Sequence, residues 1–447
     1  MIAVKDQSQS SYKKLTRNIV SLLIIQISNY ALPLLSVPYF TRIVGPEKFG
    51  IINFVAAFVG YCTLITSFGF DTSATRDVVQ AKEDPDKLNQ LCSEVIYSKC
   101  LLLVLSVGGY VLLVFFLPQL RSELFVSLSS VLICLSIVLI PSWLYQGFQD
   151  NHILAYYNIA SKIIFTIAIL TLVKVEEDYI LYPLFLSLSQ IIIGIIAFHR
   201  IFFKYQIKLI KVTCSNIIAR LQSSKSIFIS FVIISLYSTS NVIIIGLFRD
   251  EEAVGHLSAA LKIMVLIQAC MSMPFSQALF PFIGQKFKAS REEGVKVVQL
   301  TMPIMLSIGF LCCSLCCLLA PFLVLLLFGA EFSEAVSIVR VLSFIPLIVI
   351  FSQFLGIHIM VNLNMDQAFK KVTIIGAIIG LISNTLGGFY GGALGISVTY
   401  LLTELLVACL FAYYLDKEGI SVAGLFAKFN KESFLSLVRH IKNVKMS

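Results

Sequence analysis

The sequence alternates long apolar runs with short polar segments from end to end. A helix needs about 20 apolar residues to cross the roughly 30 Å hydrocarbon core of a bilayer. Twelve runs approach or exceed that size, at 19–39, 49–70, 100–120, 124–148, 153–173, 179–198, 226–248, 253–283, 297–319, 335–361, 372–389 and 393–415. The pattern therefore predicts an all-α polytopic membrane protein with twelve transmembrane helices.

Glycine and proline set two of these boundaries. The run 372–403 has no charge, but four glycines cluster within it at 387, 388, 391 and 392, so we divide it into two helices joined by a tight turn. Pro321 and Gly329 predict that the ninth span ends early, because proline lacks the backbone donor that a helix interior uses.

The composition excludes a water-soluble fold. Of 447 residues, 58% are hydrophobic and only 13% are charged, and the mean hydropathy is +0.90. Soluble domains carry about 25% charged residues, so most of this surface must face lipid. The eleven cysteines show no metal-ligand or redox spacing in a polar loop, and we expect neither a metal nor another cofactor.

The charge distribution predicts an orientation. The net charge is +9, from 34 lysines and arginines against 25 acidic residues. With the N-terminus inside, 26 of these cations fall in inner loops and tails and six fall outside. Cytoplasmic loops of membrane proteins carry such an excess, so both termini are expected to be cytoplasmic. The same bias explains the basic charge without a nucleic-acid partner.

The two halves of the chain resemble each other. Segment 45–53 opens the second span and segment 250–258 opens the eighth, 205 residues later. This repetition favours a parallel duplication of six helices, although chance matching of short glycine motifs stays an alternative. We predict an N-lobe at 1–205, a connector at 206–225 and a C-lobe with a cytoplasmic tail at 226–447. The connector mixes apolar and basic residues, which predicts an amphipathic helix at the cytoplasmic surface.

Several ionisable side chains fall inside the predicted spans. Lys162 lies in the fifth span, Lys262 in the eighth and Glu404 in the twelfth. Each costs at least about 2.5–3.5 kcal/mol at mid-bilayer, so each needs a reason. One reading is structural, either an ion pair in which Glu404 pairs with a lysine or lysine side chains that snorkel to the interface. The other is a cationic, water-filled cavity. Such a cavity would attract an anionic, phosphate-bearing substrate.

Polar groups also mark the first two spans. Asn29 interrupts the first span, which carries Pro33 and Pro38 and should therefore face an internal cavity. Asp71 and the Arg76–Asp77 pair mark the inner end of the second span. They are read either as an interfacial salt bridge at a helix terminus or as gating groups.

The order of several short motifs resembles that of a known transporter group. The motifs are TRIVGPEKFG at 41–50, FGF at 68–70 with ATRD at 74–77, WLYQG at 143–147, SK at 161–162, AVG at 253–255 with ALKI at 260–263, FG at 328–329 and TE at 403–404. Over about residues 15–415 the chain is similar to the Wzx-type flippases for O-antigen and other polysaccharides. They belong to the polysaccharide transporter family of the MOP superfamily, with the MATE exporters and lipid II flippases.

The resemblance implies two six-helix lobes around a central cavity, as in the MATE-like fold. It implies a flippase that moves an undecaprenyl-pyrophosphate-linked repeat unit of O-antigen or capsule across the bacterial inner membrane by alternating access. The polymerase and the chain-length regulator of the same pathway are expected partners. By this resemblance the pyrophosphate and sugar contacts are Lys162, Lys262, Arg42, Arg76 and Asn29. The gating or ion-coupling groups are Glu404, Asp71 and Asp77.

Two other functions remain as alternatives at this point. A MATE-like, ion-coupled multidrug exporter has the same fold, but a cavity for cationic drugs calls for acids where this sequence has lysines. A polysaccharide polymerase or ligase is a membrane enzyme, but the chain lacks the large outer loop that such enzymes display. No nucleophile motif, P-loop or dinucleotide fingerprint occurs. We therefore expect a transporter and not an enzyme.

Overall fold

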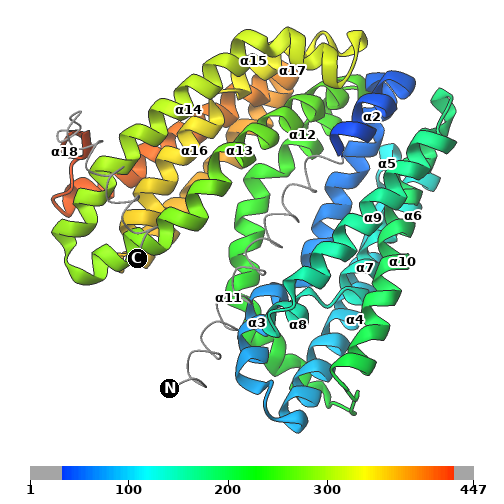
Figure 1. Cartoon of the computed structure of the whole chain (residues 1–447). Helices are drawn as coiled ribbons and strands as arrows, with labels where there is room; N and C mark the ends of the chain where they lie inside the picture. Colours follow the sequence, from blue (N-terminus) through cyan, green and yellow to red (C-terminus); the bar gives the residue numbers. More distant parts are fainter. Residues whose placement is uncertain (1–32, 427–447) are drawn as a thin grey trace, which may run out of the picture. The chain divides into compact units, whose positions relative to one another are not determined.

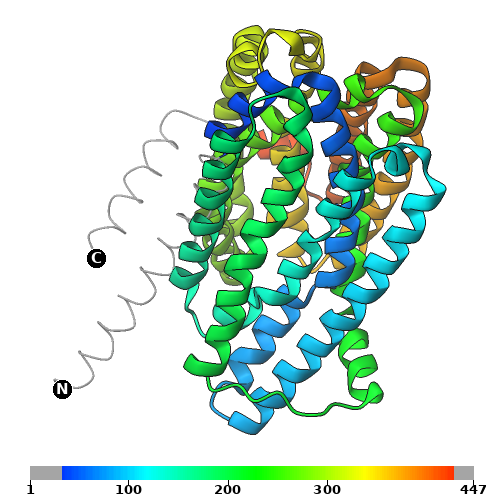
Figure 2. The same cartoon turned by 90° about the vertical axis from the view of Figure 1, so that its right-hand side faces the viewer.

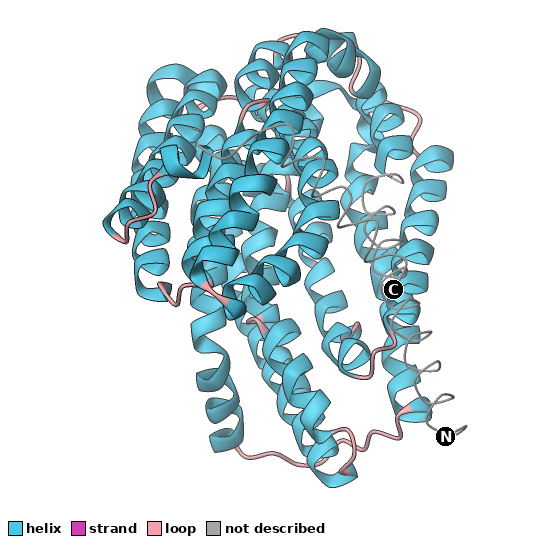
Figure 3. Ribbon diagram, turned by 60° about the vertical axis from the view of Figure 1, so that its left-hand side comes forward, coloured by secondary structure: helices cyan, strands magenta, loops and turns pink. Residues whose placement is uncertain are grey.

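The computed structural model describes residues 33–426, and every regular element within them is a helix. Figure 3 shows these helices joined by short loops. Among residues 33–426, ten helical segments are long and apolar enough to cross a membrane. The all-α prediction is confirmed for the described residues, while most of the predicted first span, including Asn29, lies outside them.

The chain divides into two compact units, residues 1–235 and 236–447. Figure 1 labels the described α-helices that begin in the first unit, and the short 3-10 helix η1 lies among them in the chain. They are α2 (Pro33–Ser67), α3 (Phe70–Ala81), α4 (Pro85–Phe116), α5 (Pro118–Ser122), α6 (Leu124–Val131), α7 (Ile133–Leu139), α8 (Ser142–Gly147), α9 (Asn151–Leu172), η1 (Glu176–Ile180), α10 (Leu181–Lys204) and α11 (Cys214–Ser238). The last of these, α11, crosses the boundary between the units.

The second unit continues with helices of very different lengths. They are α12 (Ser240–Phe248), α13 (Glu251–Ala289), α14 (Arg291–Leu327), η2 (Ala330–Phe332), α15 (Ala335–Leu342), α16 (Ile345–Gln353), the π-helix η3 (Phe354–Val361), α17 (Asp366–Lys417) and α18 (Val422–Phe426). Within residues 1–235, the described connections include a non-helical stretch at 206–213. The predicted connector 206–225 is thus divided between this stretch and the first turns of α11.

The longest helix, α17, is two helices joined at a glycine. Gly392 has φ of 59° and ψ of −144°, a left-handed conformation that favours glycine. The halves run back along each other, since Thr399 Oγ1 donates to Asn384 Oδ1 at 2.8 Å. A Cβ at Gly387 would lie 2.7 Å from the Gly395 oxygen, so this crossing requires glycine. The predicted turn is confirmed. With both halves counted, the described residues hold eleven candidate spans, and the remaining one of the twelve predicted is the first span, which lies mostly outside them.

The ninth span is predicted to end early because of Pro321 and Gly329. The structure shows that Pro321 does not end the helix, whereas Gly329 does. Helix α14 continues through Pro303 and Pro321 to Leu327. Prolines are tolerated inside membrane helices where neighbouring groups satisfy the freed carbonyls. Gly329 has φ of 103° and donates its backbone N–H to the carbonyls of the last turn, which ends the helix.

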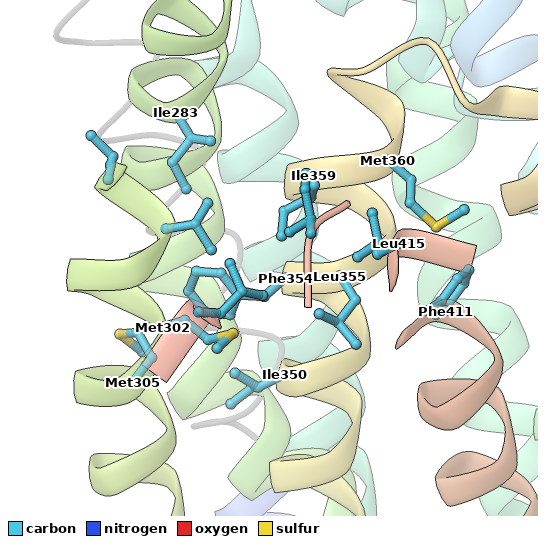
Figure 4. Close-up of a cluster of buried hydrophobic side chains, with 14 of the residues drawn as sticks. Ile283, Met302, Met305, Ile350, Phe354, Leu355, Ile359, Met360, Phe411 and Leu415 are labelled. Carbon is cyan, nitrogen blue, oxygen red and sulfur yellow. The ribbon is translucent and has the colours of Figure 1, made fainter. Parts of the chain in front are cut away.

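Apolar side chains fill each unit and also cover it. In the first unit, Trp143 and Tyr145 of α8 are buried against α3, α4 and α10. Figure 4 shows the second unit's core, where Met302 of α14 packs near Phe354 of η3 and other apolar side chains. Large apolar residues such as Phe116 also remain exposed along the long helices. This combination is expected when the surrounding solvent is lipid.

Candidate functional site

The break between α2 and α3 depends on two residues with positive φ. Phe68 has φ of 47° and Gly69 has φ of 74°. A Cβ at Gly69 would lie 2.8 Å from Ile227 Cγ2 of α11, so only glycine fits this close approach. The break makes α3 a short separate helix that carries Asp71, Arg76 and Asp77.

Asp71 is held by three donors from three helices. Its carboxylate accepts hydrogen bonds from Ser67 Oγ at 3.0 Å and Ser142 Oγ at 2.7 Å. Lys99 of α4 lies 3.4 Å from Asp71 Oδ1 and also donates to the Ile137 carbonyl at 3.4 Å. The Lys99 side chain is 2% exposed and the Asp71 side chain is 44% exposed. The result is a fixed ion pair with one accessible face.

A second ion-pair group joins α3, α4 and α11. The Arg220 guanidinium of α11 lies 2.6 Å from Asp77 of α3 and 2.8 Å from Glu94 of α4. Glu94 also accepts hydrogen bonds from Asn216 at 3.2 Å and Gln90 at 3.0 Å. A guanidinium presents several donors in a planar fork, which allows it to bind two carboxylates at once.

Helices α3 and α11 pack antiparallel with a regular register. Asp77 pairs with Arg220, Ser73 Oγ lies 2.8 Å from Ser224 Oγ, and Gly69 lies against Ile227. Each step advances four residues along α3 and three or four in reverse along α11, so one face of each helix is used. Small residues on such a face let two helix backbones approach closely. The first part of α11 is therefore docked on the first unit.

The two parts of the spanning segment formed by α11 and α12 contact different helices. Tyr61 of α2 donates to the carbonyl of Ser235 at 3.1 Å, four residues before the helix is interrupted at Thr239. Beyond that point α12 packs on α17, where Asn384 Nδ2 donates to Asn241 Oδ1 at 2.7 Å. Both asparagine side chains are buried.

Glu404 is the buried carboxyl of the second unit. It lies on the second half of α17, next to Thr403, whose hydroxyl is 3.1 Å from that of Ser383. Within the part of the chain that the structure describes, Glu404 makes no ion pair within 4.0 Å. The structural ion pair considered from the sequence, with Glu404 bound to a lysine, is absent there.

The four predicted cationic contacts lie on four different helices or helix segments. Arg42 is exposed near the start of α2, and Arg76 is exposed on α3, beyond the other end of α2. The intervening helix 46–67 spans about 30 Å at 1.5 Å per residue. Lys162 is half-buried on α9, and Lys262 is exposed on α13 of the second unit. The first unit thus does not gather its predicted cations at a single point.

Sequence reasoning missed Lys99 and Arg220 as partners of the predicted acids, and it missed Glu94 as the second carboxylate bound to Arg220. It assigned both cations to loops, because each lies just before the apolar run of a predicted span. The start of α4 was detectable, since Asp84 accepts from the Lys87 N–H as an N-cap and Pro85 follows at the first helical position. That signal would have placed Lys99 about four turns inside a helix.

The sequence matches one family and two relatives over most of its length. A family described as "Polysaccharide biosynthesis protein" matches residues 15–287. A relative from Escherichia coli (strain K12) is 28% identical over 91% of this chain and 98% of its own length. One from Shigella dysenteriae is 24% identical over 88% of this chain and 97% of its own. Both carry the name "Putative O-antigen transporter".

Solved structures share the fold at low identity. The lipid II flippase MurJ in an inward closed conformation aligns with a TM-score of 0.66 and 15% identity, over 95% of each chain. An inward-facing MATE family multidrug transporter of the MOP superfamily aligns with a TM-score of 0.65 and 12% identity, over 92% of this chain and all of its own. These likenesses show the fold alone.

Proposed function

Because the chain belongs to the polysaccharide biosynthesis protein family, we propose that it is a flippase for an undecaprenyl-pyrophosphate-linked oligosaccharide. The cargo is a repeat unit of O-antigen or capsule, and the protein moves it across the bacterial inner membrane by alternating access. The observation that carries the proposal is the match to two O-antigen transporter relatives over nearly their whole lengths. The fold shared with a lipid II flippase supports it.

The cations supply the contacts for an anionic head group. Lys162 lies in the middle of a spanning helix and is half-buried. An ammonium at that depth is costly in lipid, so we place it on a wet surface that the pyrophosphate reaches. Because the intervening helix 46–67 is about 30 Å long, Arg42 and Arg76 serve as successive contacts along a path. Lys262 has the corresponding role in the second unit, and Asn29 is assigned to the sugar.

The acids are assigned to gating and coupling. Asp71 and Asp77 are bound to Lys99 and Arg220, which join α3 to α4 and α11. We assign this ion-pair group to a gate, because water or substrate phosphate can compete for each charge. Glu404 is buried, and a carboxyl in such surroundings is neutral unless it is paired. We assign it to proton coupling.

The proposed topology is based on the charge bias of the loops, and the proposed partners are based on the resemblance to polysaccharide flippases. Both termini are cytoplasmic, and a six-helix N-lobe at 1–205 precedes the connector 206–225 and the C-lobe at 226–447. The expected partners are the polymerase and the chain-length regulator of the same pathway. The protein acts as a transporter and performs no chemistry on its cargo.

The test uses a strain that lacks the gene and carries the wild-type protein or a variant. Lys162→Gln and Lys262→Gln should each abolish surface polysaccharide, with lipid-linked repeat units trapped on the inner leaflet and the protein still inserted. Lys87→Gln, which changes an exposed lysine paired with Asp84, is the matched control and should keep the polysaccharide. Full polysaccharide in both variants would overturn the charged-path mechanism. Unpolymerised units on the outer leaflet of the gene-deleted strain would indicate a polymerase instead.

A further inference from the structure

The chain between Asp178 and Asp250 contains no acidic residue but seven cations, at 200, 204, 208, 211, 220, 225 and 249. Acids from elsewhere compensate two of them, since Lys204 pairs with Asp150 and Arg220 pairs with Asp77 and Glu94. Among the described residues, no carboxylate lies within 4.0 Å of Lys208 or Lys211. Two exposed lysines therefore remain uncompensated in one short segment.

That segment, 205–213, connects two helices that are each long enough to cross a membrane. The candidate spans are Glu176–Lys204 on one side and Cys214–Leu236 on the other. A connection of nine residues between two spans must lie at one surface of the bilayer. Figure 2 shows it as the green connection across the bottom of the first unit.

The segment is held in place by side chains of α4. Ile207 is buried in the core of the first unit. The backbone N–H of Lys208 donates to Asn89 Oδ1 at 2.8 Å, and that of Ile210 donates to Ser93 Oγ at 2.9 Å. Because these bonds fix the backbone, the outward side chains are presented in a defined arrangement and not on a loose loop.

The outward side chains combine charge with apolar surface. Lys208 and Lys211 are exposed and flank Leu209 and Ile210, which are 37% and 42% exposed. Two exposed aliphatic side chains at a membrane boundary can enter the acyl region. The neighbouring ammonium groups then lie at the depth of the lipid phosphates.

We propose that residues 208–211 form a binding site for an anionic phospholipid. Lys208 and Lys211 contact the headgroup phosphate, and Leu209 and Ile210 pack on the acyl chains. Charge complementarity selects an anionic over a zwitterionic lipid, because each lysine near an anionic surface adds to the attraction. The site differs from the proposed cargo path and does not depend on what the protein transports.

The test measures lipid binding to the purified full-length protein in detergent. Fluorescent phosphatidylglycerol and phosphatidylcholine are titrated, and affinity is followed by thermophoresis. The double variant Lys208→Gln, Lys211→Gln should bind phosphatidylglycerol roughly 10- to 30-fold more weakly, with phosphatidylcholine binding unchanged. Raising the salt should weaken the wild-type affinity toward that of the variant. Lys208→Arg with Lys211→Arg keeps the charges and should keep the affinity.

The matched control replaces two lysines that lie outside the proposed site. Lys82→Gln with Lys87→Gln changes the net charge equally, at the turn before α4 and in the first turn of α4, and should leave the affinity unchanged. Equal phosphatidylglycerol affinity in the 208/211 variant and the wild type would overturn the proposal. So would an equal loss in the 82/87 control, an equal loss for phosphatidylcholine, or full displacement of the lipid by micromolar inorganic phosphate.

Discussion

The two units bury polar side chains in opposite ways. In the first unit, α3 is joined to α4 and α11 by full charges, with Lys99 on Asp71 and Arg220 on Asp77 and Glu94. In the second unit, α12 is joined to α17 by neutral groups, through the hydrogen bonds of Asn384 with Asn241 and Thr399. Removing one partner leaves an unpaired charge in the first case and an unpaired dipole in the second.

The difference indicates which junction responds to its surroundings. In the first unit the Asp71 and Asp77 side chains are 44% and 27% exposed, whereas Glu94 is buried. Water, protons or a substrate anion can therefore compete for these ion pairs. Asn241 and Asn384 are almost fully buried, and an uncharged amide pair in such surroundings has no competitor. A gate fits the first junction, and a static joint fits the second.

The largest predicted effect comes from removing the guanidinium that serves two carboxylates. Arg220→Met leaves Asp77 and Glu94 without their shared cation and should lower the free energy of unfolding by about 3 kcal/mol. Denaturation of the purified protein in mixed detergent micelles measures it. Arg76→Met is the control, because that side chain is 69% exposed and 3.6 Å from Asp77, and it should change stability by less than about 0.5 kcal/mol. Equal losses in the two variants would remove the contrast between the units.

The next effect concerns the other ion pair. Lys99→Met should cost about 2 kcal/mol of unfolding free energy, less than Arg220→Met, since Asp71 keeps its serine donors and its contact with solvent. Adding Asp71→Asn to Lys99→Met should restore part of the loss, because no unpaired charge then remains. The same denaturation experiment measures these changes. If the loss of unfolding free energy in the double variant equals the sum of the losses in the two single variants, the charges do not interact directly.

The spans and the turn at Gly392 were predictable because their signals are local. The length of an apolar run sets a membrane helix, and a glycine cluster marks a reversal wherever it occurs. The π-helix η3 carries no such local mark, since its residues Phe354–Val361 read as an ordinary apolar run. Pro321 gave a wrong boundary because the cost of a proline depends on neighbouring helices, which the local sequence does not contain.

The acids of the candidate site were predictable, but their partners were not. Asp71 and Asp77 were found by their position at the end of a span, and Arg76 was assigned to Asp77 because it is adjacent in sequence. The structure keeps Arg76 at 3.6 Å from Asp77 and adds a closer partner at 2.6 Å, Arg220, which is 143 residues away. That pairing depends on the register of α3 against α11, and the register is set by the small residues Gly69, Ser73 and Ser224. A single sequence does not show which helices pack together.

The neutral junction of the second unit should give a smaller loss than either ion pair. Asn241→Leu removes the acceptor of the Asn384 amide and should cost about 1 kcal/mol, because hydrogen bonds between membrane helices contribute little net energy. Thr385→Val is the control, since within the described part of the chain that hydroxyl bonds just the Leu381 carbonyl of its own helix. If Asn241→Leu lowers the free energy of unfolding as much as Arg220→Met does, the charge of the buried groups does not explain the difference between the two junctions.

The smallest predicted effect concerns an ion pair outside the candidate spans, that of Asp150, which lies between α8 and α9. Burial acts to raise the pKa of Asp150, but hydrogen bonds from Lys204 and Tyr205, both at 2.6 Å, outweigh it and hold the pKa below its usual value. A carboxyl with a lowered pKa in the folded state contributes stability above its unfolded value of about 3.9, and this contribution is lost as the pH falls.

Asp150→Asn should therefore lower the unfolding free energy at pH 6 by about 0.5 kcal/mol, and its difference from the wild type should shrink by pH 3. Burial and the bond to Asp150 raise the pKa of Tyr205, so its hydroxyl stays a donor across this range and does not add a second titration. Glu83→Gln, at an exposed turn position, should show no such convergence. If the Asp150→Asn difference is the same at both pH values, the ion pair of Asp150 with Lys204 does not stabilise the first unit. The contrast with the second unit is then confined to the ion pairs of α3, α4 and α11.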